Sequence, residues 1–273
     1  MDKIIILDYG SQYTQLIARR IREQHVYSEI VPFDITAEKV RAYAPKGVIL
    51  SGGPNSVFEE GAPGIDRGIW DIGVPILGVC YGMQLMSQEL GGKVQPGEKR
   101  EYGKTEMTVK PGNELFKGLP DKFVVWMSHG DRVSAIPDGF KVSATSANCP
   151  FAAVRNEERR FFGIQFHPEV VHTEHGKQIL SNFVFNICRA NADWQLTTWI
   201  EDTVEKMKRQ VGDDEVVLGL SGGVDSSVAA VLLHKAIGPR LHCIFVDNGL
   251  LRYREAEQVE EMFAKNLGLD LTK

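Results

Sequence analysis

The sequence has few of the features that mark disulfide-rich, membrane or nucleic-acid-binding proteins. Its four cysteines lie far apart without a C-x-x-C pair, so we expect neither a disulfide scaffold nor a structural zinc site. No apolar run reaches the ~18 residues of a membrane helix, and we expect no signal peptide before Asp2. With 31 Lys and Arg against 36 Asp and Glu, the net charge of −5 indicates no bulk nucleic-acid binding. These absences predict a soluble, cytoplasmic protein.

The composition that remains is that of an ordinary globular protein. Hydrophobic residues make up 43% of the 273 residues and charged residues 25%, which excludes a disordered or collagen-like chain. At about 150 residues per domain, this length predicts about two domains, each with enough apolar residues for a core.

The first part of the chain alternates short apolar runs with helical spacings of apolar residues. The expected strands are residues 3–8, 28–31, 47–51 and 75–79, and the expected helices are residues 14–23 and 36–43. Continuous apolar runs are typical of strands that are buried on both faces. Alternation of such strands with helices predicts a doubly wound parallel sheet.

From about Gly103 the pattern changes to short strands separated by Pro, Gly and Asn turns. These strands are expected at 102–109, 123–127, 140–145, 151–154 and 161–166, and a helix at 176–190 follows them. We therefore predict a first α/β domain over residues 1–191, built on a mixed, mainly parallel open sheet.

Residues 192–273 repeat the alternation of helix and strand. A connecting helix at 194–210 leads to strands at 215–220 and 241–246, with helices at 226–237 and 255–266. Three strands at most make a poor stand-alone α/β domain. We therefore expect this segment to be the N-terminal part of a larger doubly wound domain, because the next strand should begin where the sequence ends at Lys273.

The sequence Gly78-Val79-Cys80-Tyr81-Gly82 is the cysteine counterpart of the G-x-S-x-G nucleophile elbow. It follows an apolar strand and precedes a helix, so its glycines permit a tight turn that presents the side chain at the strand tip. The positive end of the helix dipole favours a thiolate there. A lone cysteine is more often a buried core residue, but the flanking glycines favour a nucleophile.

A cysteine nucleophile needs an imidazole base, and the base needs an orienting carboxylate. His167 and Glu169 supply both at the end of another expected strand, where Pro168 stiffens the turn. We expect the strand tips to bring both to Cys80 at one sheet edge. The segment Ser51-Gly52-Gly53-Pro54 could be a simple turn, but its backbone N–H groups could also face an oxyanion, together with the N–H of Tyr81.

The motifs G-V-C-Y-G-M-Q, S-G-G-P and F-G-I-Q-F-H-P-E-V together resemble the class I (triad-type) glutamine amidotransferases. The resemblance implies Cys80 as nucleophile, His167 as base and Glu169 as its partner, with a glutamyl thioester and released ammonia. It also implies that Gln84 contacts bound glutamine and that Ser128 and His129, in M-S-H-G-D, lie near it. For His172 and His175 we expect structural or interfacial roles.

A second motif, S-G-G-V-D-S, follows the strand at 215–220 and opens a helix. Its glycine N–H groups, serine hydroxyls and helix N-terminus make a phosphate cradle that is not a Walker A loop, because the lysine is absent. The motif resembles the pyrophosphate loop of ATP pyrophosphatases. The resemblance implies ATP binding by Ser221, Gly222, Gly223, Val224, Asp225 and Ser226. It also implies that Asp225 helps to hold Mg²⁺ and that the segment 245–252 lies near adenine and ribose.

The two sites in this order resemble the GMP synthetase family, as do V-W-M-S-H-G-D-R-V and F-V-D-N-G-L-L-R. The resemblance implies that ammonia from glutamine amidates ATP-activated xanthosine monophosphate (XMP), giving GMP, AMP, pyrophosphate and glutamate. We expect only the glutaminase half to be intact here. The resemblance further implies a homodimeric full-length enzyme, and no organic prosthetic group is expected. Three alternatives remain open: another glutamine-dependent ATP-pyrophosphatase ligase, a stand-alone cysteine hydrolase, and a non-catalytic regulatory module.

Overall fold

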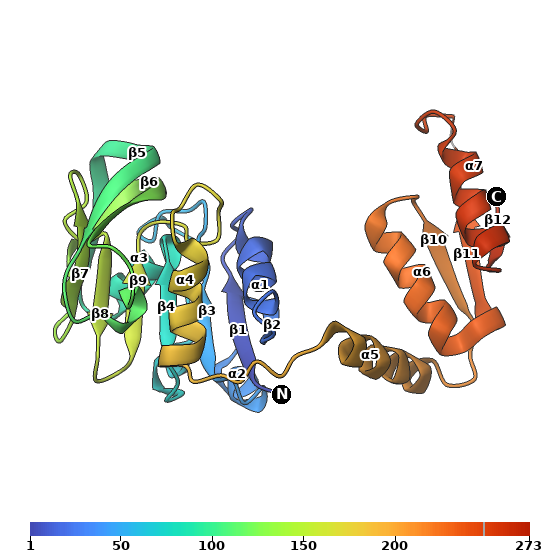
Figure 1. Cartoon of the computed structure of the whole chain (residues 1–273), viewed down its shortest axis with the longest axis horizontal. Coiled ribbons are helices and arrows are strands. Elements are labelled where there is room, and N and C mark those ends of the chain that lie inside the picture. The colour runs from blue at the N-terminus through green and yellow to red at the C-terminus, as the bar shows by residue number, and fades with distance from the viewer. Residues whose placement is uncertain (248) are drawn as a thin grey trace. The chain divides into compact units, whose positions relative to one another are not determined.

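The structure is a computed structural model that describes residues 1–247 and 249–273, with the backbone alone for residues 98–100. The chain divides into two compact units, Met1–Trp194 and Gln195–Lys273 (Figure 1). In the described part of the chain, no helix combines the length and the apolar character needed to cross a membrane.

The first unit is built on one nine-stranded sheet with the order β2-β1-β3-β4-β9-β8-β7-β5-β6. Its strands are β1 (Lys3–Asp8), β2 (Tyr27–Pro32), β3 (Gly47–Leu50), β4 (Ile76–Val79), β5 (Lys93–Val109), β6 (Lys122–Ala135), β7 (Lys141–Ser146), β8 (Ala153–Asn156) and β9 (Phe161–Ile164). Neighbours from β2 to β9 pair in parallel, and those from β9 to β6 pair antiparallel. The predicted mixed α/β fold is confirmed.

Helices cover both faces of the parallel half of this sheet. On one face lie α1 (Thr14–Arg22), α4 (Gly176–Ser181) and its π-helical continuation η3 (Asn182–Ile187), and on the other lie α2 (Ala37–Ala42), η1 (Arg67–Asp71) and α3 (Tyr81–Glu89). Strand β1 shows how the sequence produces two cores, because Ile4 and Ile6 join one core while Ile5 and Leu7 join the other. A continuous apolar run is therefore buried on both faces.

The β5–β6 hairpin is longer than the sequence pattern predicted. Its strands pair from Lys93 with Ala135 to Thr108 with Lys122, with a register shift between Pro96 and Glu101. The short helix η2 (Glu114–Phe116) lies in the connection between them. Backbone pairing continues through charged, Gly and Pro positions. The alternation of hydrophobic residues therefore identifies only the inner part of the hairpin.

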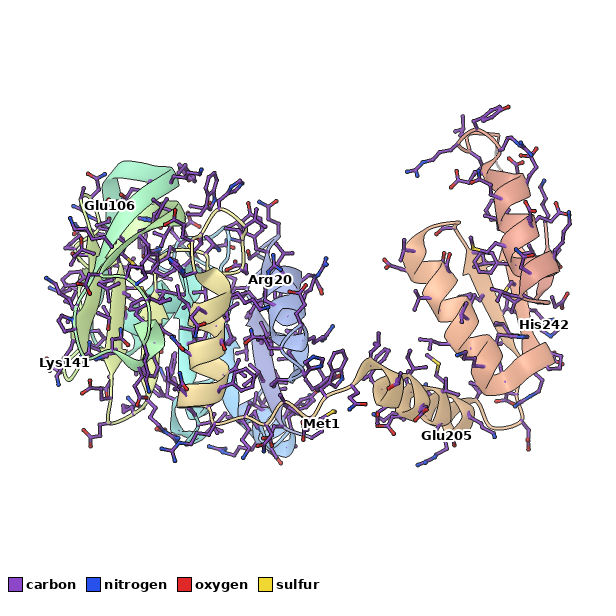
Figure 2. All side chains as sticks on the ribbon, viewed as in Figure 1. Met1, Arg20, Glu106, Lys141, Glu205 and His242 are labelled. Carbon is purple, nitrogen blue, oxygen red and sulfur yellow. The ribbon has the colours of Figure 1, made fainter. Side chains whose placement is uncertain are left out.

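The second unit contains a three-stranded parallel sheet in the order β10-β11-β12. Its elements are α5 (Leu196–Val211), β10 (Val216–Leu220), α6 (Val224–Ile237), η4 (Gly238–Arg240), β11 (Leu241–Phe245), α7 (Glu255–Glu260), η5 (Glu261–Asn266) and β12 (Asp270–Thr272). Its core joins Leu220, Leu241 and Phe263. The side chain of His242, labelled in Figure 2, projects from β11.

Candidate functional site

Cys80 lies at the tight turn between β4 and α3. Its backbone has φ 51° and ψ −106°, in the left-handed half of conformational space that non-glycine residues rarely adopt. A larger residue would not fit at either neighbouring glycine. A Cβ on Gly82 would lie 2.4 Å from the carbonyl oxygen of Leu50, and a Cβ on Gly78 would lie 2.6 Å from the backbone of Gly82. Helix α3 therefore packs directly on β3 and presents the thiol at the strand tip.

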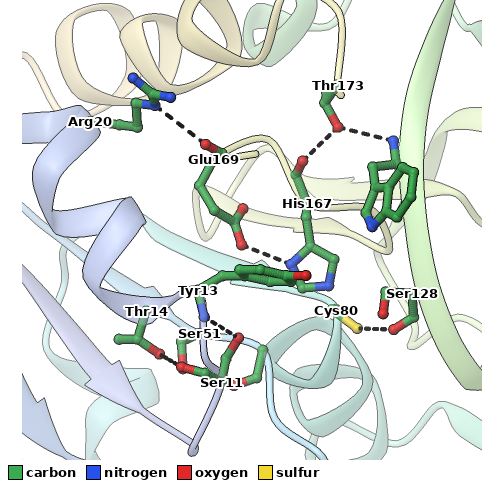
Figure 3. Close-up of polar contacts among 12 residues, drawn as sticks. Ser11, Tyr13, Thr14, Arg20, Ser51, Cys80, Ser128, His167, Glu169 and Thr173 are labelled. Atoms are coloured by element: carbon green, nitrogen blue, oxygen red, sulfur yellow. Dashed lines mark hydrogen bonds and ion pairs between the residues drawn. The ribbon is translucent and has the colours of Figure 1, made fainter. Parts of the chain in front are cut away.

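His167 and Glu169 follow β9, which is the parallel neighbour of β4. The backbone N–H of Cys80 donates to Ile164 at 2.8 Å, so the two strand ends are joined just before the site. His167 Nδ1 lies 2.7 Å from Glu169 Oε1, and the imidazole lies between this carboxylate and Cys80 (Figure 3). All three residues are buried, with 5%, 4% and 1% of Cys80, His167 and Glu169 exposed. The structure thus brings the three predicted residues together at one sheet edge.

Backbone contacts from β6 hold His167 in place. Its N–H donates to the carbonyl of Trp126 at 3.1 Å, and its own carbonyl accepts from Thr173 Oγ1 at 2.6 Å. The same Thr173 oxygen accepts from the N–H of Trp126 (Figure 3). The ring of Tyr13 meets the imidazole edge-on at 5.4 Å. The imidazole is therefore fixed in both position and orientation.

The pKa of His167 is raised well above its ordinary value. Burial by itself lowers that pKa, but the contacts of the ring with Cys80 and Glu169 outweigh the burial. Burial raises the pKa of the Cys149 thiol to about 12 and raises that of Cys188 as well. The Cys80 thiol instead contacts the imidazole of His167.

The Ser51–Pro54 segment lies against the elbow. The carbonyl of Ser51 accepts from the N–H of Gly82 at 3.1 Å, and the Ser51 hydroxyl accepts from the N–H of Tyr9 at 3.0 Å. A Cβ on Gly53 would lie 2.7 Å from the carbonyl oxygen of Tyr9. Among the described residues, no hydrogen bond is recorded for the backbone N–H groups of Gly53 and Tyr81. These two N–H groups are free to bind a ligand.

Cys80 opens into a pocket of about 750 Å³ whose walls include Gly53, Gln84, Ser128 and His129. The Gln84 amide nitrogen donates to the carbonyl of Asp131 at 2.9 Å, and Ser128 contributes its carbonyl oxygen, 3.6 Å from Cys80 Sγ. The predicted glutamine-contacting residues therefore line the pocket into which the thiol opens.

Gln165 is a neighbour of the thiol that the sequence patterns did not single out. Its amide nitrogen lies 3.7 Å from Cys80 Sγ, and its amide oxygen accepts from Gln84 at 3.3 Å. Its side chain is fully buried. Its place two residues before His167, inside F-G-I-Q-F-H-P-E-V, is the signal that could have identified it.

The loop Ser221–Ser226 joins β10 to α6 in the second unit. Ser226 Oγ accepts from the N–H of Ser221 at 3.2 Å and lies 3.0 Å from Ser221 Oγ, which fixes the loop as a closed turn. Gly222 has φ +76°, and Gly223 caps α6. Asp225 is exposed in the first turn of α6, and within the described residues its carboxylate has no recorded hydrogen bond or ion pair.

The remaining predicted residues lie near these two sites or outside the described part. Asp247 accepts from the N–H of Gly249 at 2.9 Å after β11, while Asn248 lies outside the described residues. His172 packs on the ring of Trp126 at 4.7 Å, and His175 meets Phe123 edge-on at 5.5 Å. Both histidine rings therefore take part in packing beside the site.

Comparison with known families matches the two parts of the chain separately. The profile of the family "Glutamine amidotransferase class-I" matches residues 5–187, and the profile "NAD synthase" matches residues 194–273. The first match covers well over half of the chain and includes Cys80, His167 and Glu169.

Curated relatives match along the whole chain. It is 56% identical to "GMP synthase [glutamine-hydrolyzing]" of Lacticaseibacillus rhamnosus, over 100% of this chain and 53% of that protein. It is 55% identical to the protein of the same name from Neisseria meningitidis serogroup B, over 98% of this chain and 52% of that protein. The chain thus spans about half the length of these relatives.

A solved structure matches the first unit. It comes from Thermoplasma acidophilum and is described as one of the subunits of a GMP synthase. It is 37% identical with a TM-score of 0.64, covering 69% of this chain and 94% of its own.

Proposed function

The chain belongs to the class-I glutamine amidotransferase family, and from that premise we propose that its first unit hydrolyses glutamine at Cys80. The observation that carries the proposal is the buried arrangement in which His167 holds Glu169 at 2.7 Å on one side and faces the strained Cys80 on the other. Such an arrangement supports a nucleophile with an oriented base and no solvent competing for its proton.

In the proposed reaction, the Cys80 thiolate attacks the amide carbonyl carbon of glutamine. His167 gives its Nε2 proton to the departing nitrogen, so ammonia leaves and a glutamyl thioester remains. A water molecule then attacks the thioester, His167 accepts its proton, and the thiolate leaves to give glutamate. Glu169 accepts from Nδ1–H throughout, which stabilises the imidazolium and keeps Nε2 directed at the reacting atoms.

Two backbone N–H groups are suited to the negative oxygen of the tetrahedral intermediate. Those of Gly53 and Tyr81 have no recorded protein partner among the described residues. Gly53 lines the pocket that contains Cys80, and Tyr81 directly follows Cys80 in the chain. Donors that are fixed before the reaction stabilise developing charge without reorganising. We assign Gln84, Ser128 and His129 to the wall that binds glutamine, because all three line the same pocket.

For the second unit we propose that Ser221–Ser226 bind the phosphates of ATP. The closed turn places serine hydroxyls at the N-terminus of a 14-residue helix, and a helix N-terminus favours an anion. The exposed Asp225 carboxylate is the kind of oxygen ligand that suits Mg²⁺, which shields phosphate charge when it is bound with ATP. Asp225 is therefore the residue that we expect to hold the ion.

For the complete protein we propose glutamine-dependent synthesis of GMP from XMP. Ammonia from the first unit would displace AMP from an adenylylated purine oxygen. The relatives named GMP synthase support this assignment, since they match the chain from end to end. A homodimer and a cytoplasmic location stay predictions.

The profile named NAD synthase favours one second candidate. Amide formation that yields NAD requires the acid form of NAD as the acceptor in place of XMP. The ATP loop suits either acceptor, because each would be activated by adenylylation.

Labelling with a diazoketone analogue of glutamine tests the glutaminase half. We expect one adduct, on Cys80, that excess glutamine suppresses and that Cys80→Ser abolishes. Cys188→Ser, which removes another buried thiol of the same unit, should label like the parent chain. An adduct on another cysteine, or none in the folded chain, would refute the assignment of Cys80.

Pyrophosphate release from ATP and Mg²⁺ by the complete protein tests the acceptor. We expect release that depends on XMP and disappears in Ser226→Ala. Release with the acid form of NAD alone would replace the GMP assignment by the second candidate. No pyrophosphate release with either acceptor would contradict adenylylation by the complete protein.

A further inference from the structure

A second Glu, His and Cys cluster adjoins the pocket and is separate from the Cys80 group. Glu101 on β5 and His129 on β6 are cross-strand partners, and Cys149 follows β7, the other neighbour of β5. One ligand atom of each side chain lies within 4.8 Å of those of the other two. The exposed fractions of the three residues are 7%, 7% and 1%. Glu101 and His129 are brought together by the register of β5 and β6, and Cys149 comes from the connection after β7.

The protonation of His129 follows from its contacts. Its Nδ1 lies 2.9 Å from the carbonyl oxygen of Asp131, and because a carbonyl can only accept, Nδ1 carries a proton. In the neutral ring, Nε2 then presents a lone pair. That lone pair lies 3.1 Å from Glu101 Oε2, and the two atoms are not aligned as a hydrogen bond.

With His129 neutral, the cluster presents mainly lone pairs, and its donor is the weak S–H group of Cys149. Neither Glu101 oxygen nor His129 Nε2 has a hydrogen-bond partner among the described residues. A buried carboxylate without a partner is costly, and two buried lone pairs that face each other repel. A cation among these atoms would remove both costs.

We propose that Glu101, His129 and Cys149 bind one divalent transition-metal ion of the zinc type. One oxygen, one imidazole nitrogen and one thiolate form a donor set that zinc accepts, with a fourth position left for water. Magnesium and calcium prefer sets made only of oxygen ligands. Binding replaces the Cys149 S–H bond by a metal–sulfur bond and releases the thiol proton to solvent.

The site adjoins the pocket that contains Cys80, because His129 lines that pocket. The Asp131 carbonyl that faces His129 Nδ1 also accepts from Gln84. A bound ion would fix the imidazole and, through that carbonyl, the wall on which Gln84 lies. The site does not depend on the proposed glutamine hydrolysis.

Cobalt titration of the metal-free full chain tests the proposal. Cobalt(II) is a coloured substitute for zinc that shows a thiolate-to-cobalt charge-transfer band in the near ultraviolet when a cysteine binds it. We expect this band to saturate at one equivalent, and added Zn²⁺ to remove it. No saturable band in the folded, reduced chain would overturn the proposal.

Variants identify the ligands. Cys149→Ser should lose the charge-transfer band, and Glu101→Gln should weaken binding by about tenfold or more. Cys80→Ser is the matched control, because Cys80 lies in the competing Cys, His and Glu group, and the band should persist in it. A band that persists in Cys149→Ser, or that disappears in Cys80→Ser, would refute the site. If Cys149→Ser fails to fold, the Glu101→Gln affinity and the Cys80→Ser band still decide.

Discussion

Nδ1 of His167 and Oε1 of Glu169 lie 2.7 Å apart in a site from which solvent is largely excluded. The carboxylate accepts from Nδ1–H, which leaves Nε2 for the exchange of a proton with Cys80 or a ligand. Because the contacts with Cys80 and Glu169 outweigh the effect of burial, the pKa of His167 is raised. The ring therefore keeps its proton to a higher pH than an ordinary histidine does. A thiolate beside an imidazolium is the reactive form of a cysteine nucleophile.

Replacement Glu169→Gln tests the carboxylate. The amide oxygen can still accept from Nδ1–H, but the negative charge that raises the pKa of His167 is gone. We expect kcat for glutamine hydrolysis to fall by roughly 10²- to 10⁴-fold. The alkaline limb of the pH profile of kcat/KM should move to lower pH, because the imidazolium then loses its proton earlier.

Glu174→Gln is the control for this measurement. Glu174 lies on the same segment, but its carboxylate accepts from the backbone N–H of Val124 at 2.8 Å, which an amide oxygen can also do. Its pH profile should match that of the parent chain. An alkaline limb that stays unchanged in Glu169→Gln would contradict the role given to that carboxylate.

Gly82→Ala should destabilise the first unit. The added Cβ would lie 2.4 Å from the carbonyl oxygen of Leu50, and backbone cannot move aside as a flexible side chain can. We expect the free energy of unfolding to fall by about 1–3 kcal/mol or more in urea titration. Gly64→Ala, with no atom within 4 Å of its Cβ, is the control. Equal stability of the two variants would show that α3 moves away from β3 easily.

Asp225→Asn should weaken the binding of ATP with Mg²⁺ and leave the binding of ATP without Mg²⁺ nearly unchanged. The amide keeps the size of the side chain but removes the charge that a hard cation prefers. We expect a loss of about tenfold, equivalent to ~1.4 kcal/mol, by titration calorimetry. Asp214→Asn, an exposed aspartate of the same unit before β10, should bind as the parent does. A loss that is equal with and without Mg²⁺ would contradict metal binding by Asp225.

The sequence predicts the parts of this molecule that depend on local pattern. Strands β1, β3 and β4 follow from apolar runs, because burial on both faces leaves polar residues only at the two ends of β1. The meeting of Cys80 with His167 follows from the rule that parallel strands end at one edge. Both inferences require the pattern and the topology but no side-chain detail.

Two other features leave no local pattern in the sequence: the register between distant strands, and the change from α-helical to π-helical hydrogen bonds. Glu101 meets His129 only because β5 and β6 pair in one particular register, and the bulge after Pro96 helps to set that register. The helix expected over 176–190 changes to π-helical turns, in which the N–H of Cys188 donates to Phe183 at 2.8 Å. The apolar spacing of that segment is compatible with either helix. These features depend on tertiary packing.

His242 should make the second unit less stable as the pH rises. The hydrogen bond to Asp270 at 2.6 Å, with a smaller effect of Glu215, raises the pKa of His242 above its ordinary value of 6.5. A group whose pKa is raised by folding stabilises the folded state fully at pH values below its pKa in the unfolded chain. This stabilisation is lost as the pH rises through its pKa in the folded state. Amide hydrogen exchange at β11 and β12, corrected for intrinsic exchange rates, should therefore become faster as the pH rises above 6.5.

Asp270→Asn should remove most of this pH dependence, because it removes the largest cause of the raised pKa. Asp213→Asn, an exposed aspartate on another loop of the same unit, should keep it. The exchange is measured on the full chain. The amides of β1 and β3, in the first unit, serve as an internal reference in the same measurement. A pH dependence that survives in Asp270→Asn would mean that the protonated His242 is stabilised by Glu215, which lies 3.4 Å from Nε2.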